Sequence, residues 1–334
     1  MDFDFSDEQK EIKRVARELL AARSPFAKVR QAAEAGAYDA GLWRELVELG
    51  WPGIAVSPAA GGQGLGFVEL AVLLEELGYA CAATPFLSTA TVATLLDACG
   101  SAEQRERWLE RLVSGEATAG LGARELAADA LEAEVIVLLD GEEAQLVARE
   151  DAEVRPFSAI DPTRRFATVA GEGEPLGQGA VARARVALAA EVVGVCQRAL
   201  DMTVEYVKDR RQFGVPVGSF QAVAHRCAQM LLHTESARSA AYFAAWAADA
   251  APDRLAEATA LAAAAGAEAG LETSASAIQA HGGIGFTWEA DVHWLFKRAQ
   301  LDSWLLGGSR RHRAALARLG AERLRSRAPT TAAG

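Results

Sequence analysis

The stretch Asp209–Gln221, DRRQFGVPVGSFQ, separates two long helical patterns and decides how the second half of the chain folds. Before it, apolar residues recur at spacings of one to four from Val192 to Val207, and a similar series extends from Phe220 to Leu231. Such spacings are typical of amphipathic helices. Because the connection is short, we expect the two helices to pack side by side in opposite directions.

Three further helical patterns follow this pair. They are an alanine-rich segment over residues 256–281, a segment from about 289 to 302, and a last one after the loop LLGGS at residues 305–309. The first pair of patterns and the segments 256–281 and 289–302 are joined by short connections. The sequence therefore predicts a C-terminal four-helix bundle over residues 184–330.

The first part of the chain, residues 1–118, is predicted to form a helical domain. Ser6 is suited to cap the first helix, and Asp7 and Glu8 favour the positive end of its dipole. Another pattern, residues 42–49, stops at Gly50, as helices often do.

The pattern changes over residues 119–183. Val135–Leu139 is a short apolar run, Asp140-Gly141 is a turn signal, and Gln145–Ala148 can return as a partner strand. Phe166–Ala170 is another strand candidate. We expect a small, shortened middle β domain here, and thus a mostly α-helical protein overall.

Composition limits the classes of function. The chain has 334 residues, of which 51% are hydrophobic, and its net charge is −11. This charge argues against binding to nucleic acid or to an anionic membrane, and no apolar run reaches the roughly 18 residues of a membrane helix. The start of the chain lacks the basic character of a signal peptide, so a cytoplasmic protein is expected.

Neither the cysteines nor the first glycine-rich loop indicates a ligand site. The cysteines are far apart and lack metal-site spacing, so we expect buried thiols and no metal; they are Cys81, Cys99, Cys196 and Cys227. The loop AAGGQGLG at residues 59–66 follows no strand, and we interpret it as a tight turn between helices.

Four segments together carry a family resemblance. They are Asp209–Gln221, Ile278–Thr287 (IQAHGGIGFT), Glu75–Gly78 (EELG) and residues 100–116 (GSAEQRERWLERLVSGE). With them the chain resembles the acyl-CoA dehydrogenase family, flavoproteins that introduce an α,β double bond into acyl-CoA thioesters. The resemblance covers nearly the whole chain and implies FAD as the cofactor.

The resemblance assigns five residues to flavin contact: Arg210, Phe213, Gln279, Gly282 and Gly283. An arginine offers paired donors that suit a pyrophosphate, and glycines let backbone and amide groups approach the cofactor. In homotetrameric members such groups reach the flavin of the neighbouring subunit. Taken alone, the same residues are also compatible with a solvated arginine, a phenylalanine that fills a core, and a helix that ends at glycines.

The positions that hold the catalytic glutamate in this family contain no carboxylate here. The resemblance places the usual base at Leu306 or Gly307, and the less common one at Ala184, just before Arg185. The family's T-E-P and G-S-D motifs are also absent from the middle segment, where Glu125 is the nearest match. Since a positioned general base contributes about 10²- to 10⁴-fold, its loss is severe.

Three functions remain open. The leading hypothesis is a short subunit of a heterotetrameric (α2β2) acyl-CoA dehydrogenase, resembling those that act on steroid side-chain thioesters, with a larger family member as partner and an electron-transfer flavoprotein as acceptor. The second is an active homo-oligomer with Asp302 or Glu191 as a displaced base. The third is a non-enzymatic assembly module without flavin.

The loop LLGGSRRHR, residues 305–313, corresponds in position to the family's catalytic loop but is basic. Arg310, Arg311 and Arg313 oppose the dipole of the helix that follows them. An acidic partner surface or a phosphate would explain these charges, and so would a simple solvated turn.

Overall fold

The computed structural model describes residues 4–327 and begins with a helical domain. Ser6 accepts a hydrogen bond from the backbone of Gln9, whose side chain bonds back to Ser6, so the predicted cap is a full capping box. The helices of this domain are α1 (Asp7–Arg23), α2 (Phe26–Ala35), α3 (Ala40–Glu48), α4 (Phe67–Ala80), α5 (Phe86–Cys99) and α6 (Ala102–Val113).

A seven-stranded sheet follows, in the order β5-β6-β2-β1-β3-β4-β7. Only β1 and β3 pair in parallel among these strands. The predicted strands are confirmed, and β3 turns into β4 between Asp140 and Glu143. The strands are β1 (Ala119–Ala123), β2 (Leu126–Ala128), β3 (Val135–Asp140), β4 (Glu143–Ala148), β5 (Glu153–Pro156), β6 (Ala167–Ala170) and β7 (Glu174–Pro175).

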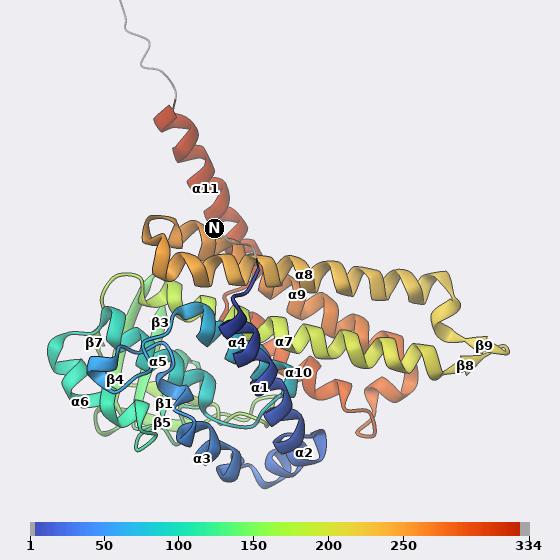
Figure 1. Ribbon diagram of the computed structural model, residues 1–334, viewed down its shortest axis with the longest axis horizontal. Helices are drawn as coiled ribbons and strands as arrows, with labels where there is room; N and C mark the ends of the chain where they lie inside the picture. The colour runs from blue at the N-terminus through green and yellow to red at the C-terminus, as the bar shows by residue number, and fades with distance from the viewer. Residues whose placement is uncertain (1–3, 328–334) are drawn as a thin grey trace, which may run out of the picture.

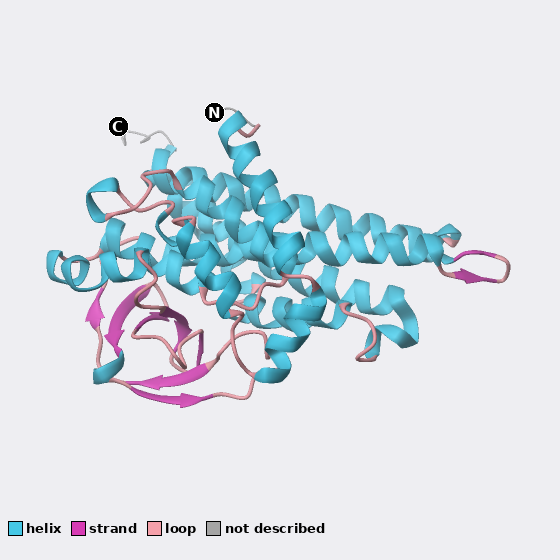
Figure 2. Ribbon diagram, turned by 60° about the horizontal axis from the view of Figure 1, so that its bottom comes forward, coloured by secondary structure: helices cyan, strands magenta, loops and turns pink. Residues whose placement is uncertain are grey.

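Long helices form the rest of the molecule (Figures 1 and 2). The bundle consists of α7 (Ala180–Asp209), α8 (Gln221–Ala250), α9 (Leu255–His281) and α10 (Val292–Leu305), as predicted. A small hairpin, β8 (Arg211–Gln212) and β9 (Val215–Pro216), joins α7 to α8 at the end of the bundle farthest from the sheet. The last helix, α11 (Ser309–Arg327), points away from the body of the molecule.

Helices α4 and α7 approach each other so closely that only glycine fits at their crossing. A Cβ atom on Gly194 would overlap the carbonyl oxygen of Glu75, and one on Gly78 would overlap that of Glu191. Gly78 is the last residue of the EELG segment, so one reason for that glycine is helix packing. The crossing fixes the N-terminal domain against the bundle.

The side chains of the two glutamates of the EELG segment connect α4 to α1 and α8. Glu75 is buried and bonds to Lys13 of α1 at 2.7 Å and to Arg238 and Tyr242 of α8. Glu76 pairs with Arg17 of α1. Two buried carboxylates on α4 therefore connect α1 with the bundle, and each has cationic partners, which offset the cost of burial.

The prediction for the cysteines is half right. Cys81 and Cys196 are buried, and burial raises the pKa of each thiol to about 12. Cys99, the last residue of α5, and Cys227, in α8, are partly exposed. No helix within residues 4–327 is both long and apolar enough to cross a membrane.

Replacing Gly194 with alanine tests the close crossing. We expect the free energy of unfolding to fall by about 3 kcal/mol or more, because the added methyl overlaps backbone atoms of α4 that cannot move independently. Gly320→Ala is the control, since nothing lies within 4 Å of that position in α11 and alanine favours a helix. Urea unfolding of both variants makes the comparison; equal stabilities would contradict the packing argument.

Candidate functional site

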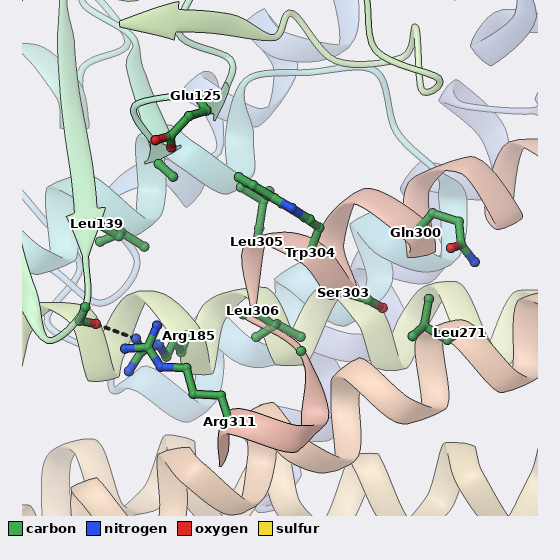
Figure 3. A pocket seen from close by; sticks show the side chains of 14 residues that line it. Glu125, Leu139, Arg185, Leu271, Gln300, Ser303, Trp304, Leu305, Leu306 and Arg311 are labelled. Atoms are coloured by element: carbon green, nitrogen blue, oxygen red, sulfur yellow. Dashed lines mark hydrogen bonds between the residues drawn. The ribbon is translucent and has the colours of Figure 1, made fainter. Parts of the chain in front are cut away.

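A cavity of about 580 Å³ lies where the middle sheet meets the bundle (Figure 3). It is formed by the β1–β2 turn, the end of β3, one residue of α7, one of α9, and the segment from α10 into α11. Its lining residues are Ala123, Glu125, Leu139, Gly141, Arg185, Leu271, Gln300, Ser303, Trp304, Leu305, Leu306, Gly307, Gly308 and Arg311.

The positions of the family's catalytic base lie at or beside this cavity. Leu306 is fully buried and Gly307 also lines the cavity, while Ala184 is buried in α7 next to Arg185. Glu125 is the only carboxylate among the lining residues of this cavity. None of the three base positions carries a group that accepts a proton.

The loop after α10 is held in one shape by its glycines and by His312. Gly307 and Gly308 have φ of +87° and +73°, the left-handed region that favours glycine. His312 is buried, and burial together with nearby Arg185 and Arg311 lowers its pKa. The neutral ring donates from Nε2 to the carbonyl of Leu306 at 2.5 Å, which fixes the loop against the start of α11.

The basic residues of this loop find acidic partners within the chain. Arg311 bonds to Glu142 at 3.3 Å, and Arg313 bonds to Glu268 of α9. Arg310 is exposed, with no side-chain partner among residues 4–327. Two of the three charges thus have an intramolecular explanation that sequence inspection did not supply.

The two candidates for a displaced base lie in a buried ion cluster and not in the cavity lining. Arg164, on the loop between β5 and β6, bonds to Asp302 of α10 at 2.6 Å and to Glu191 of α7. Arg298 of α10 bonds to Glu191 at 3.0 Å and to Asp161 at 2.8 Å. All five side chains are at most 3% exposed. We therefore interpret Asp302 and Glu191 as structural residues.

The cluster holds three carboxyl groups against two guanidinium groups, so one carboxyl lacks a full counter-charge. Burial, with Glu191 and Asp161 nearby, raises the pKa of Asp302 to about 7 despite the opposing effect of Arg164 and Arg298. Its Oδ2 atom has no hydrogen-bond partner within the described residues. Asp302 is the member of the cluster that takes up a proton near neutral pH.

The residues assigned to flavin contact lie elsewhere, on the surface at the far end of the bundle. Arg210 caps the C-terminus of α7, is exposed, and has no side-chain partner within residues 4–327. Phe213 lies at the tip of the β8–β9 hairpin and is 93% exposed, so the interpretation as a core-filling residue is wrong. The tip is a two-residue turn in which Phe213 and Gly214 both have positive φ, and the chain there extends away from any core.

The second group, at the end of α9, is also exposed. Gln279 faces solvent, and the helix ends at Gly282, whose φ of +65° favours glycine. Gly283 has an ordinary φ, and a Cβ atom there would meet nothing within 4 Å. Helix termination therefore accounts for Gly282, but no contact or conformation in the described chain accounts for Gly283.

The structure thus places the loop after α10, called the base loop because it holds the usual base positions Leu306 and Gly307, at the cavity. The residues assigned to flavin contact lie outside the cavity. None of the five residues assigned to flavin contact lines the cavity. Sequence analysis missed Trp304 and Gln300 of the lining, and also Asp161, Arg164 and Arg298 of the ion cluster. Nothing in their local pattern distinguishes them from ordinary helix and loop residues.

Comparisons with known proteins match both helical parts of the chain. Residues 6–116 match the N-terminal domain of acyl-CoA dehydrogenases, and residues 171–320 match the C-terminal domain. The chain belongs to the acyl-CoA dehydrogenase family. It is 35% identical over 313 residues to acyl-CoA dehydrogenase IpdE2 of Mycobacterium tuberculosis, covering 91% of this chain and 94% of that relative.

Solved structures of this family share the fold. A variant of the Tcur3481-Tcur3483 steroid ACAD superposes with a TM-score of 0.86 at 28% identity, covering 95% of this chain and 98% of the other. The ChsE4-ChsE5 complex from Mycobacterium tuberculosis gives 0.84 at 24% identity, over 99% and 100%, which is a likeness of fold. Members of the family are oxidoreductases, and FAD is their cofactor.

The exposed residues at the far end of the bundle have the chemistry to contact FAD. The guanidinium of Arg210 is free to pair with a pyrophosphate, and the open space beside Gly283 leaves room for a close approach. Within residues 4–327 no three His, Cys, Asp or Glu side chains are grouped to hold a metal ion.

The raised pKa of Asp302 predicts a pH-dependent stability difference from Asp302→Asn. The folded chain retains a proton that the unfolded carboxyl releases above its ordinary pKa of 3.8, so this contribution is complete below about pH 4 and is lost as the pH rises toward 7. Relative to the variant, the wild type should lose about 1.4 kcal/mol per pH unit between about pH 5 and pH 7. Urea unfolding at several pH values measures this slope.

Asp253→Asn, at an exposed position, is the matched control for that series. Its unfolding free energy should follow the wild type at each pH. Parallel curves for the wild type and Asp302→Asn would contradict the assignment of the proton to Asp302.

Proposed function

We propose that this chain is the shorter, catalytically incomplete subunit of a heterotetrameric acyl-CoA dehydrogenase, and that it completes the flavin site of a larger partner subunit. In this division of labour the partner supplies the glutamate and most of the flavin pocket. This chain supplies Arg210, Phe213, Gln279 and the glycines that follow α9. FAD, when bound, would supply the hydride acceptor for dehydrogenation of the acyl-CoA thioester.

The observation that carries the proposal is the geometry at Gly283 and Phe213. Gly283 has open space and an ordinary backbone, so the chain itself gives no reason for a glycine there. Phe213 combines 93% exposure with a left-handed φ of +52°, which costs a non-glycine residue about 1 to 2 kcal/mol. Strain and apolar exposure on one side chain favour a contact outside the chain.

Other exposed apolar side chains lie near this group. Phe286 and Trp288, just after the double glycine, are 80% and 69% exposed, and Leu231 and Leu232 are exposed on α8. Large apolar patches on soluble proteins usually belong to interfaces. A partner that reaches Arg210 and Gln279 would cover them.

The absence of a carboxylate at Leu306, Gly307 and Ala184 supports the assignment of the base to the partner. An active homo-oligomer would need Asp302 or Glu191 as base, but each is paired with a buried arginine and lies outside the cavity lining. An assembly module without flavin would leave Arg210 and Gly283 without a ligand.

The proposed substrate rests on one structural relative. The likeness to the Tcur3481-Tcur3483 steroid ACAD favours a steroid-derived acyl-CoA substrate. The acceptor proposed for the reduced flavin is an electron-transfer flavoprotein, and the proposed compartment is the cytoplasm. We also propose the domain limits expected from the sequence: an N-terminal helical domain over 1–118, a middle β domain over 119–183 and a C-terminal bundle over 184–330.

Flavin content tests directly whether the partner subunit supplies most of the flavin pocket. The chain should purify with little flavin alone, and with about one flavin for every two chains after coexpression with a larger family member encoded beside it. Absorbance near 450 nm against protein concentration gives the ratio. One flavin per chain in the protein purified alone would overturn the proposal, and so would the absence of any heteromer.

A variant of Arg210 tests the contribution in trans. Arg210→Gln in the coexpressed complex should weaken flavin retention about tenfold or more, because a charged hydrogen bond to pyrophosphate is lost. Arg211→Gln is the matched control, since Arg211 is equally exposed on the same hairpin but its side chain bonds only to the carbonyl of Gly214 among the described residues. Dialysis against buffer, followed by the flavin-to-protein ratio, compares the two; equal retention would contradict the role of Arg210.

A further inference from the structure

The cavity at the base loop has a charge pattern that the loss of a catalytic base does not explain. Its lining is mainly apolar, with Leu139, Leu271, Leu305, Leu306 and Trp304 contributing side chains. At about 580 Å³ it is within the size range of small-molecule sites. A site that had only lost its function would need no cations.

Two cations nevertheless meet at one end of it. The guanidinium groups of Arg185 and Arg311 lie side by side, away from Glu125 (Figure 3). Both bond to the same oxygen of Glu142, Arg185 at 2.8 Å and Arg311 at 3.3 Å. One carboxylate therefore serves two guanidinium groups, and this end of the cavity keeps a net positive charge.

The shared carboxylate is poorly placed to be a permanent counter-ion. The Glu142 side chain is 75% exposed, on the turn between β3 and β4, whereas the Arg185 side chain is only 9% exposed. The other terminal nitrogen of Arg185 donates to the carbonyl of Gly141 at 2.6 Å. An incoming anion can thus replace or join Glu142 while Arg185 stays in position.

The nearest histidine adds no competing acceptor. The Nε2 atom of His312 is used by the carbonyl of Leu306, and its neutral state follows from burial beside the two arginines. Glu125, the only lining carboxylate, lies away from the arginine pair. The cavity therefore has one anion-binding end and an apolar body.

We propose that this cavity binds an apolar carboxylate, with the carboxylate between Arg185 and Arg311 and the hydrocarbon part against Leu306 and Trp304. The ligand is either a free acid or an acyl thioester that bears a second carboxylate at its far end. This proposal does not rest on the heteromer, because every contact comes from this chain.

Binding of octanoate, octan-1-ol and octylamine tests the proposal, by titration calorimetry on the purified full chain and on the coexpressed complex. Octanoate should bind at least about tenfold more tightly than the alcohol, since a charge-assisted pair replaces a neutral hydrogen bond. The amine should bind most weakly. Equal affinity for acid and alcohol, or no binding of octanoate, would overturn the proposal.

Two variants test the positions of the charges. Arg311→Gln should weaken octanoate binding about tenfold, and Glu142→Gln should strengthen it at least about threefold, because the competing carboxylate is removed. Arg313→Gln is the matched control: it lies on the same helix turn, pairs with Glu268 and is outside the lining. Unchanged affinity in Glu142→Gln and Arg311→Gln, or an equal loss in Arg313→Gln, would refute the assignment.

Trp304 gives a local signal, because it lines the cavity and is half exposed. Octanoate should change the tryptophan emission of the wild type, and the change should disappear in Trp304→Phe. A change that persists would locate the ligand elsewhere and overturn the proposal.

Two thioesters distinguish the sources of the carboxylate. Suberyl-CoA, which carries a far carboxylate, should bind more tightly than octanoyl-CoA in either case. If it also binds more tightly than octanoate, the ligand is an acyl thioester; if not, it is a free acid. Equal binding of the two thioesters would contradict the proposal that the ligand is a thioester. Equal binding of the thioesters together with no binding of octanoate would overturn the proposal for the cavity. Flavin content, measured separately, reports on the proposed heteromer.

Discussion

The buried cluster of two arginines and three carboxyl groups is the constraint on which the rest of the structure depends. Arg164 comes from the middle domain, Arg298 from α10 and Glu191 from α7, so the cluster joins the sheet to the bundle at a point that water does not reach. Removing one partner of such a cluster leaves an uncompensated buried charge, which typically costs about 3 to 5 kcal/mol. Asp302 lies one helical turn before the base loop, and the shape of the cavity therefore depends on the same ions.

Patterns of residues that are close together in sequence predicted most of the helices and strands. The cap at Ser6, the hairpin turn at Asp140 and the four bundle helices depend on residues close together in sequence, and each was predicted. The ion cluster could not be predicted this way, because Arg164 and Asp302 are 138 positions apart. The same applies to the cavity lining, which is assembled from the sheet and four helices. Sequence resemblance identified the base loop, but only the structure revealed that Arg311 and Arg185 meet there.

Phe213 illustrates a different limit of sequence reasoning. A phenylalanine between two helices is more often buried than exposed, and its actual place at a hairpin tip follows from the positive φ of two successive residues. The β8–β9 hairpin, which carries Phe213, lies at the opposite end of the molecule from β1 and β3, which contribute to the cavity lining (Figure 1). Within the described chain, the flavin-contact residues and the cavity lining therefore share no residue.

The exposed aromatic side chains at the far end of the bundle also bear on how this chain is made in the cell. Phe213, Phe286 and Trp288 are each largely exposed, and exposed apolar side chains favour aggregation of incomplete assemblies. On the proposed function, a partner subunit would cover these side chains. Balanced synthesis of the two subunits would then be as much a condition for a stable enzyme as any contact within the fold.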